Sequence, residues 1–259
     1  MIESSDFAVD FPIKDIHGHC GTFATFNVPD AQGAKLDAVI RQNGISEVCI
    51  APFIGLSCAC AQSNRMMAEL SDKYSSMRGL CLIDPYDASE TENQLAYCFE
   101  ANRFAGLKFH PYYNQVPDDH KGYEAALAYA DKHKLFILWH YGGGVDYLRE
   151  LSSGYPNANF VLAHYGTVWN GEACDDTKKI LKLVAILDNV YTDLAGSVCY
   201  LDALPKLLDL IPYEKVLFGS DMCFLDAAFQ LGQTLRAAIP AAAKYAILCG
   251  NYDRIVNPG

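Results

Sequence analysis

Short apolar runs alternate along the chain with longer segments in which apolar residues recur at helical spacing. Residues 45–51 form one of the short runs, and Ile and Val dominate it. Residues 34–42 form one of the longer segments, with Leu36, Val39 and Ile40 on one face. Short β-branched runs predict buried strands, and the 3.6-residue spacing predicts amphipathic helices. The chain is therefore expected to alternate between strand and helix.

The predicted strands cover residues 11–16, 45–51, 78–83, 105–109, 135–139, 159–163, 189–194 and 215–218. The predicted helices cover residues 34–42, 62–75, 89–102, 123–133, a segment ending at 151, 176–187, 201–211, 225–238 and 241–248. Ser89 and Glu92 have the spacing of a capping box at the start of the third helix. Eight strand–helix units in about 250 residues favour a closed (β/α)8 TIM barrel over an open doubly wound sheet. Since no linker divides the chain, residues 1–259 are expected to form a single α/β domain with C-terminal closing helices.

Candidate chemistry begins at Asp15-Ile-His-Gly-His19, at the end of the first predicted strand. Side chains two residues apart in an extended strand point the same way, so His17 and His19 are expected to converge just beyond the strand end. Adjacent neutral imidazoles are suitable ligands for a divalent metal. Asp15 shares this face and is placed to orient one of the ligands.

The other histidines strengthen this hypothesis because five of the seven follow predicted strands, where the active sites of (β/α)8 barrels lie. Together with one lysine and one aspartate, the set at the strand ends is His17, His19, Lys108, His110, His140, His164 and Asp221. Several imidazoles and one carboxylate suit Zn²⁺ or a similar ion, which would lower the pKa of a bound water. Asp221 is expected both to ligate and to take a proton. His164 is the candidate acid/base or stabiliser of a developing anion.

In this order, the motifs resemble the amidohydrolase superfamily, and in particular its amidohydrolase-related branch of metal-dependent decarboxylases, lactonases and hydratases. The motif at residues 15–19 is followed by GLKFHP at 106–111, WH at 139–140, FVLAHYG at 160–166 and LFGSD at 217–221. The segment 247–255, with Asn251, resembles the closing helix of the family. The resemblance therefore covers essentially the whole chain.

The resemblance implies a metal held by His17, His19, His140 and Asp221, with His164 as a catalytic group or a supplementary ligand. Lys108 and His110 are expected to contact the substrate. Binuclear members bridge two metals with a carboxylated lysine or a glutamate at the end of the fourth strand, so a carboxylated Lys108 stays open as an alternative. A plain ammonium at Lys108 and a single Zn²⁺ ion are the favoured interpretation.

The expected function is a metal-dependent hydrolase, in which water activated by the metal attacks a carbonyl, lactone or amide carbon. The substrate is expected to be small, polar and carboxylate-bearing. A non-oxidative decarboxylase or a hydratase of the same branch is the alternative, and a barrel that binds metal or ligand without turnover is a second one. A phosphoesterase is disfavoured, because Met222-Cys223 follows Asp221 where such enzymes carry Asp-X-His.

The composition of the chain limits which partners it is expected to bind and in which compartment it is expected to lie. A net charge of −11 argues against binding to nucleic acid or to an anionic membrane surface, and a small molecule is the expected partner. No apolar stretch reaches the roughly 20 residues of a membrane span. The first residues lack the features of a signal peptide, and several of the ten cysteines lie in apolar runs and are expected to be buried free thiols in a reducing cytoplasm. A homodimer is left open.

Three further features have two interpretations each. Cys58 and Cys60 are expected to be loop thiols without a role, although they have the spacing of a soft-metal site. The glycine run 142–144 is either an anion cradle or a flexible turn. The aromatic residues after the strand ends form either a substrate wall or ordinary packing; they are Tyr112, Tyr113, Tyr141, Tyr165 and Trp169.

Overall fold

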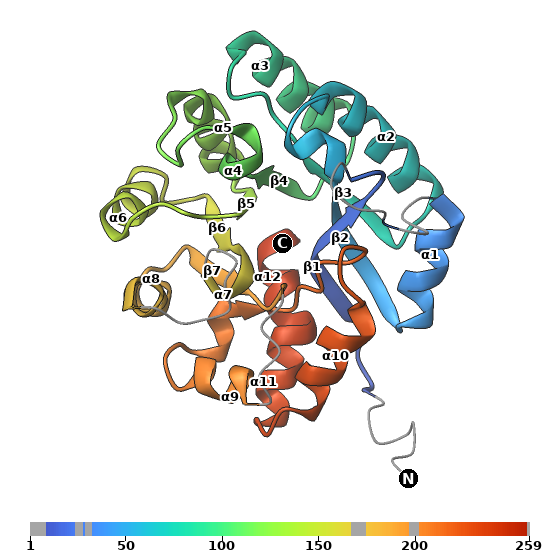
Figure 1. Ribbon diagram of the computed structural model, residues 1–259, viewed down its shortest axis with the longest axis vertical. Coiled ribbons are helices and arrows are strands. Elements are labelled where there is room, and N and C mark those ends of the chain that lie inside the picture. The colour runs from blue at the N-terminus through green and yellow to red at the C-terminus, as the bar shows by residue number, and fades with distance from the viewer. Residues whose placement is uncertain (1–8, 24–27, 29–32, 167–174, 197–201, 258–259) are drawn as a thin grey trace.

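The computed structural model contains eight parallel strands that neighbour one another in sequence order, with helices on the outside (Figure 1). It describes residues 9–23, 28, 33–166, 175–196 and 202–257. The strands are β1 (Ile13–Cys20), β2 (Ile45–Pro52), β3 (Met77–Cys81), β4 (Gly106–Phe109), β5 (Phe136–Trp139), β6 (Asn159–Leu162), β7 (Val190–Asp193) and β8 (Val216–Leu217). This arrangement confirms the predicted (β/α)8 barrel.

Helices follow the strands along the chain and surround the sheet. The α-helices are α1 (Gly33–Gln42), α2 (Cys60–Lys73), α3 (Ala88–Ala96), α4 (Pro111–Asn114), α5 (Glu124–His133), α6 (Val145–Gly154), α7 (Ala163–Gly166), α8 (Asp175–Ile186), α9 (Ala203–Leu208), α10 (Ala227–Arg236), α11 (Ala241–Tyr245) and α12 (Asn251–Val256). Short 3₁₀ turns cover Phe53–Leu56, Lys121–Tyr123 and Tyr213–Lys215, and π-helical turns cover Tyr97–Ala101 and Ala246–Gly250. Within the described residues, every helix is too short or too polar to cross a membrane.

The barrel is nearly closed, and hydrogen bonds between its first and last strands bridge the seam. The amide of Ile16 donates to the carbonyl oxygen of Phe218 at 3.0 Å, and the amide of Asp221 donates to that of His17 at 2.9 Å. Gly18 and Met222 also form a parallel bridge. The seam therefore runs directly beside the motif at residues 15–19.

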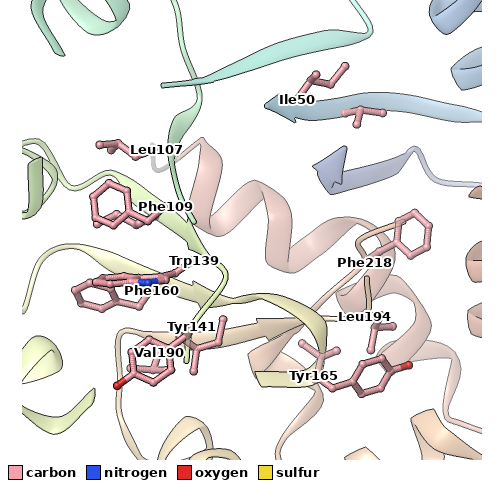
Figure 2. Close-up of a cluster of buried hydrophobic side chains, with 14 of the residues drawn as sticks. Ile50, Leu107, Phe109, Trp139, Tyr141, Phe160, Tyr165, Val190, Leu194 and Phe218 are labelled. Carbon is pink, nitrogen blue, oxygen red and sulfur yellow. The ribbon is translucent and has the colours of Figure 1, made fainter. Parts of the chain in front are cut away.

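Two hydrophobic clusters lie on opposite faces of the sheet, because successive strand residues point to opposite faces. In β5, Ile137 and Trp139 belong to the outer cluster between strands and helices, whereas Phe136 and Leu138 belong to the inner one. Figure 2 shows part of the outer cluster, including Trp139, whose ring meets those of Phe109 and Tyr141 edge-on. The α12 side chains Tyr252, Ile255 and Val256 join the inner cluster, so this helix closes the barrel interior.

The start of α3 differs from the prediction. Its N-cap is Asp87, whose carboxylate accepts a hydrogen bond from the amide of Glu90 at 3.0 Å. Ser89 instead lies inside the helix and donates to the Asp87 side chain at 2.7 Å. Asp87 and Glu90 have the same three-residue spacing as Ser89 and Glu92 but lie two positions earlier in the chain. A carboxylate caps a helix as well as a hydroxyl does.

Candidate metal centre and active site

The C-terminal ends of the strands bring the predicted site residues together in one pocket. Each predicted residue lines it, and none exposes more than 7% of its surface. Strand alternation explains the convergence: in β4, Leu107 and Phe109 pack in the outer cluster, so Lys108 between them points to the barrel axis. The pocket is lined by His17, His19, Phe23, Phe53, Leu56, Lys108, His110, Tyr113, His140, His164, Asp221 and Phe224.

A β-bulge in β1 places its two histidines. Asp15 pairs with Val48 and Gly18 with Ile50, so three steps along β1 match two steps along β2. The extra residue allows Ile16 to pack in the inner cluster while its neighbour His17 also points into the pocket. The strand predicted over residues 11–16 in fact continues through Cys20, so both histidines lie within β1.

Hydrogen bonds fix the orientation of both imidazole rings. His19 Nδ1 lies 2.9 Å from the carbonyl oxygen of Ala51, which can only accept, so this nitrogen carries the proton. His17 Nδ1 lies 2.7 Å from Asp193 Oδ2 and donates to that carboxylate. Burial and the Lys108 ammonium hold the pKa of His17 well below its usual range, which keeps that ring neutral. In neutral rings with these tautomers, each Nε2 presents a lone pair to the pocket.

Three lone-pair donors therefore converge on one point of the pocket, an arrangement that can hold a metal ion. His17 Nε2 and His19 Nε2 are 3.2 Å apart. Asp221 Oδ1 lies 3.7 Å from the first and 3.2 Å from the second. Two imidazole nitrogens and one carboxylate oxygen match the ligand preferences of a divalent transition metal. The residues present fit such an ion.

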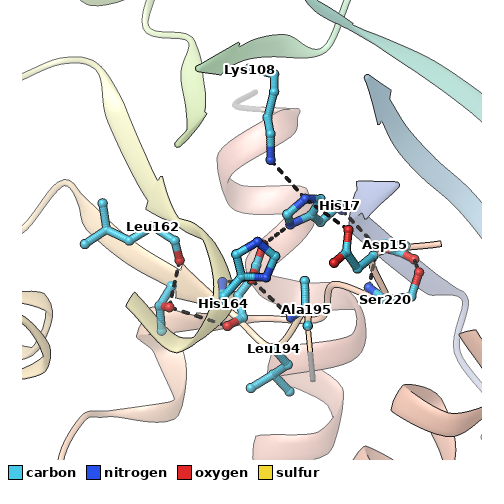
Figure 3. Close-up of polar contacts among 12 residues, drawn as sticks. Asp15, His17, Lys108, Leu162, His164, Leu194, Ala195 and Ser220 are labelled. Atoms are coloured by element: carbon cyan, nitrogen blue, oxygen red, sulfur yellow. Dashed lines mark hydrogen bonds and ion pairs between the residues drawn. The ribbon is translucent and has the colours of Figure 1, made fainter. Parts of the chain in front are cut away.

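Lys108 is the resident cation of the pocket, and Figure 3 shows its side chain extending toward His17. Its Nζ lies 2.9 Å from His17 Nε2 and donates to the lone pair there. Burial lowers the pKa of Lys108 to about 8, although Asp193 and Asp221 favour its charged form. This lysine is thus at the position of an ammonium group that can contact an anion beside the metal.

Asp221 follows β8 and is held in a left-handed backbone conformation with φ of 61°. Burial opposes its ionisation, but the histidines around it, His19 first, bring its pKa below the usual range. Asp15 supports this turn from β1: its carboxylate accepts from the amides of Ser220 at 3.1 Å and His17 at 2.9 Å, and from the Ser220 hydroxyl. Asp15 therefore positions the backbone at the seam, rather than an imidazole ring as predicted.

His164 lies in α7, where it and Tyr165 adopt left-handed backbone angles with φ of 60°. This turn brings the His164 ring to within 5.1 Å of the His17 ring and 5.0 Å of the His140 ring, measured between centroids. The amide of His164 donates to Asp193 Oδ1 at 2.7 Å. The predicted acid/base residue thus sits beside the candidate ligands.

His140 and His110 stack face to face on the far side of the pocket. Their centroids are 4.1 Å apart with an interplanar angle of 10°. Burial, reinforced by His164 and Lys108, lowers the pKa of His140 to about 3, so this ring is neutral. Among the described residues, its buried Nδ1 has no hydrogen-bond partner, as expected of a nitrogen kept for a ligand.

The tightest groups of possible metal ligands in the described parts of the chain are two trios whose ligand atoms lie within 4.8 Å of one another. One is His17, His19 and Asp221, and the other is His17, His164 and Asp193. His140 lines the same pocket but belongs to neither trio, so its role as a ligand stays a prediction.

Aromatic rings form the opposite wall. Phe53 stacks on His19 with centroids 4.7 Å apart, and Phe23 contacts both Phe53 at 4.9 Å and Tyr113 at 5.6 Å. Phe224 completes the group at 6.3 Å from Phe23. Polar groups that bind and orient therefore face an apolar surface able to pack against a flat or hydrocarbon part of a substrate.

A model of the Amidohydrolase family matches residues 53–255, more than half of the chain. The chain belongs to the amidohydrolase family. This confirms the resemblance drawn from the five ordered motifs. A comparison with curated protein sequences gives no match.

Solved structures share the fold of this amidohydrolase at low identity. The 5-carboxyvanillate decarboxylase of Sphingomonas paucimobilis has a TM-score of 0.73 at 14% identity, over 95% of this chain and 98% of that one. The dihydroxybenzoic acid decarboxylase of Polaromonas sp. JS666, solved with bound manganese, has a TM-score of 0.72 at 14% identity, over 95% and 96%. The 4-oxalomesaconate hydratase of Rhodopseudomonas palustris has a TM-score of 0.70 at 16% identity, over 94% and 95%.

Several residues of the amidohydrolase do not take part in the pocket as the sequence allowed. Tyr112 is 76% exposed, while Tyr141 and Tyr165 pack in the outer cluster, so Tyr113 alone of the described candidates lines the site. Trp169 lies outside the described residues. The amides of Gly142 and Gly143 already donate to Asp118, which argues against the anion cradle.

The two cysteines after β2, Cys58 and Cys60, lie in different environments. Cys58 is exposed, whereas Cys60 is buried and donates to the carbonyl oxygens of Gly55 at 3.4 Å and Ile83 at 3.2 Å. The structure therefore does not pair their thiols toward a metal.

Sequence analysis missed Asp193 and Ser220, which hold the candidate ligands in place. Asp193 ends β7 in the same way as the predicted site residues end their strands, and that position was the available signal. Ser220 directly precedes Asp221 in the motif, but only the structure shows that its hydroxyl contacts Asp15.

Proposed function

We propose that the chain is a metal-dependent hydrolase that acts on a carbonyl, lactone or amide carbon of a small carboxylate-bearing substrate. The convergence of His17 Nε2, His19 Nε2 and Asp221 Oδ1 carries the proposal. These lone pairs lie in a buried pocket at the strand ends, where chemistry in this barrel architecture takes place.

One Zn²⁺ ion is the proposed cofactor, held by His17, His19 and Asp221 with His140 as the further ligand. A nitrogen-rich donor set with one carboxylate favours zinc over the harder oxygen-preferring ions. When bound, such an ion lowers the pKa of a water molecule and polarises a carbonyl oxygen.

The chain's own residues supply the proton transfers. The lowered pKa of Asp221 keeps it ionised, so its carboxylate is available to accept a proton from the attacking water. His164, held beside His17, is placed to donate to the leaving group or to stabilise a developing negative charge.

Lys108 is proposed to bind the substrate carboxylate. Its ammonium lies 2.9 Å from a candidate ligand atom, so an anion held by Lys108 would lie next to the metal. An ionised partner also makes the hydrogen bond stronger than a neutral one. His110, stacked on His140, is proposed to line the substrate side of the pocket.

Non-oxidative decarboxylation is the second candidate. The wall of Phe23, Phe53, Tyr113 and Phe224 would pack against an aromatic acid, and two of the fold relatives are decarboxylases of aromatic acids by name. The decarboxylase would need a proton donor at the reacting carbon, and His164 is the candidate.

Two measurements on the purified protein test the proposal. Elemental analysis is expected to find about one zinc per chain, and the His17→Ala/His19→Ala variant is expected to lose it. Activity is then measured on a panel of lactones, amides and hydroxybenzoates, with acid release and CO₂ release recorded separately.

Hydrolysis of a lactone or amide that disappears in Asp221→Asn would support the first candidate. CO₂ release without hydrolysis would replace it with the second. Equal metal content in the wild type and the double-histidine variant would refute both, because each requires the metal at this site.

A further inference from the structure

Asp193 accepts three hydrogen bonds within the polar network of the site. It ends β7, is fully buried, and reaches two elements that are distant in sequence. Oδ2 accepts from His17 Nδ1 of β1 at 2.7 Å. Oδ1 accepts from the amide of His164 at 2.7 Å and from that of Ala195 at 3.1 Å. One carboxylate thus contacts both the candidate ligand and the candidate acid/base segment.

These contacts are hydrogen bonds rather than a second ion site. Both oxygens of Asp193 already accept hydrogen bonds. The 2.7 Å separation between Oδ2 and His17 Nδ1 is the length of a charge-assisted hydrogen bond. His17 Nδ1 carries the proton that it donates, and only Nε2 of the ring is free to ligate. The trio of His17, His164 and Asp193 is therefore a hydrogen-bonded cluster.

We infer that Asp193 is a positioning residue that selects the metal-binding tautomer of His17 and simultaneously fixes the left-handed turn carrying His164. By holding the proton on Nδ1, Oδ2 keeps the lone pair on Nε2, where it faces His19 and Asp221. By accepting the His164 amide, Oδ1 restrains a residue whose φ of 60° is unfavourable for a side chain with a Cβ. The inference rests on the proposed metal at His17 and His19.

Replacement of Asp193 by Asn separates the two functions, because an amide has one acceptor and one donor end. The acceptor end is expected to stay with the two backbone amides, since turning it would set an NH₂ group against two N–H donors. The NH₂ group then faces His17 Nδ1, which must become an acceptor. The His17 proton is then expected on Nε2, in place of the contact with the Lys108 ammonium, and that nitrogen must lose the proton before it can bind metal.

Asp131→Asn is the matched control. Its Oδ1 also accepts from two backbone amides, those of Asn157 at 2.6 Å and Ala158 at 3.3 Å. Its Oδ2 contacts the Asn157 side chain and no imidazole, so the same chemical change leaves every histidine tautomer intact.

The experiment compares the wild type, Asp193→Asn, Asp131→Asn and His17→Ala/His19→Ala. Zinc affinity is measured by competition with a chelator, and ¹⁵N NMR of histidine-labelled, metal-free protein reports the His17 tautomer. Loss of an outer-sphere partner typically weakens metal binding about 10–100-fold. We expect that loss and an Nε2-protonated His17 in Asp193→Asn, with wild-type values for both in Asp131→Asn.

Wild-type zinc affinity and an unchanged His17 tautomer in a folded Asp193→Asn protein would overturn the inference while leaving the proposed function intact. Failure of the function shows separately, as equal zinc binding by the wild type and the double-histidine variant. Weaker zinc binding in Asp193→Asn with an unchanged tautomer would also overturn the tautomer assignment, because it would indicate a merely structural effect. Circular dichroism of each variant verifies that it has folded.

Discussion

At the scale of single residues, Gly18 shows how closely the site is packed against the barrel wall. It separates His17 from His19, and a Cβ added there would lie 2.6 Å from Val48 Cγ1 and 3.4 Å from the carbonyl oxygen of Cys49. Val48 is fully buried, and its β-branched side chain has little rotamer freedom. The strand carrying the ligands would have to shift to make room.

We therefore expect Gly18→Ala to lower the free energy of unfolding by about 1–3 kcal/mol, the usual cost of overpacking. Urea denaturation of the metal-free protein measures this change. Gly232→Ala is the control, because nothing lies within 4 Å of the added Cβ in α10 and alanine is the better helix former. Equal stability of Gly18→Ala and wild type would contradict the close packing.

The identities of the residues at the strand ends were enough to predict much of the pocket lining, since all seven predicted site residues line the pocket. The residues that hold them could not be predicted in the same way. Asp193 meets His17 only because of the register between strands at opposite ends of the sequence, and a local pattern contains no information on that register. The bulge in β1 is equally invisible, because it depends on pairing with β2.

At the scale of elements, the start of α3 depends on the Asp87 carboxylate rather than on Ser89. Asp87→Ala is expected to cost about 1 kcal/mol, the typical loss of an N-cap. Ser89→Ala removes only an exposed contact to the same carboxylate and is expected to stay within about 0.5 kcal/mol of wild type. Thermal unfolding of the two variants decides which residue caps the helix. A larger loss of stability in Ser89→Ala than in Asp87→Ala would identify Ser89 as the N-cap.

The periodic pattern placed the elements well but not their ends. The predicted helix 89–102 became α3 followed by a π-helical turn, and the predicted helix 241–248 became part of the segment that runs through α12. Helix ends depend on which side chain reaches the free amides, and several candidates competed within two residues. The left-handed turn at His164 and Tyr165, which follows β6, had no signal in the apolar run.

At the scale of the whole molecule, Asn251 joins the closing helices to the barrel. Its side-chain amide donates to the carbonyl oxygens of Tyr213 and Val216, each at 2.7 Å, and the residue is 1% exposed. Asn251→Ala would leave two carbonyl acceptors without partners at the start of β8. The free energy of unfolding is expected to fall by about 1–3 kcal/mol for each acceptor that water does not reach. The exposed Asn257→Ala serves as the control. Chemical denaturation should show a clear loss for the first variant alone.

Metal binding is also expected to stabilise the whole fold, because ligands from β1 and from the segment after β8 assemble only in the native state. At a free zinc concentration 100 times the Kd, the gain is about 2.7 kcal/mol. Removal of the ion with a chelator should therefore lower the Tm of the wild type, and added zinc should restore it. The His17→Ala/His19→Ala variant should respond to neither treatment, and an equal response would place the stabilising ion elsewhere.

The overall architecture was the most predictable level. Eight alternating units restrict the topology to few possibilities, and the strand order with the hydrogen bonds across the seam confirms a nearly closed barrel. The meeting of the closing helix with the inner cluster was not predicted, because Tyr252, Ile255 and Val256 are compatible with any buried helix face.

The hydrogen-bonded seam between β1 and the β8 segment has a consequence for the order of events during synthesis. His17 and His19 leave the ribosome among the first residues of the domain, whereas Asp221 follows the last strand. A nascent chain with seven strands would carry both imidazoles but not their carboxylate, and it would bind zinc weakly. A metal held by all three residues would therefore be captured only after β8 has been translated, and it would link the first and last strands of the barrel.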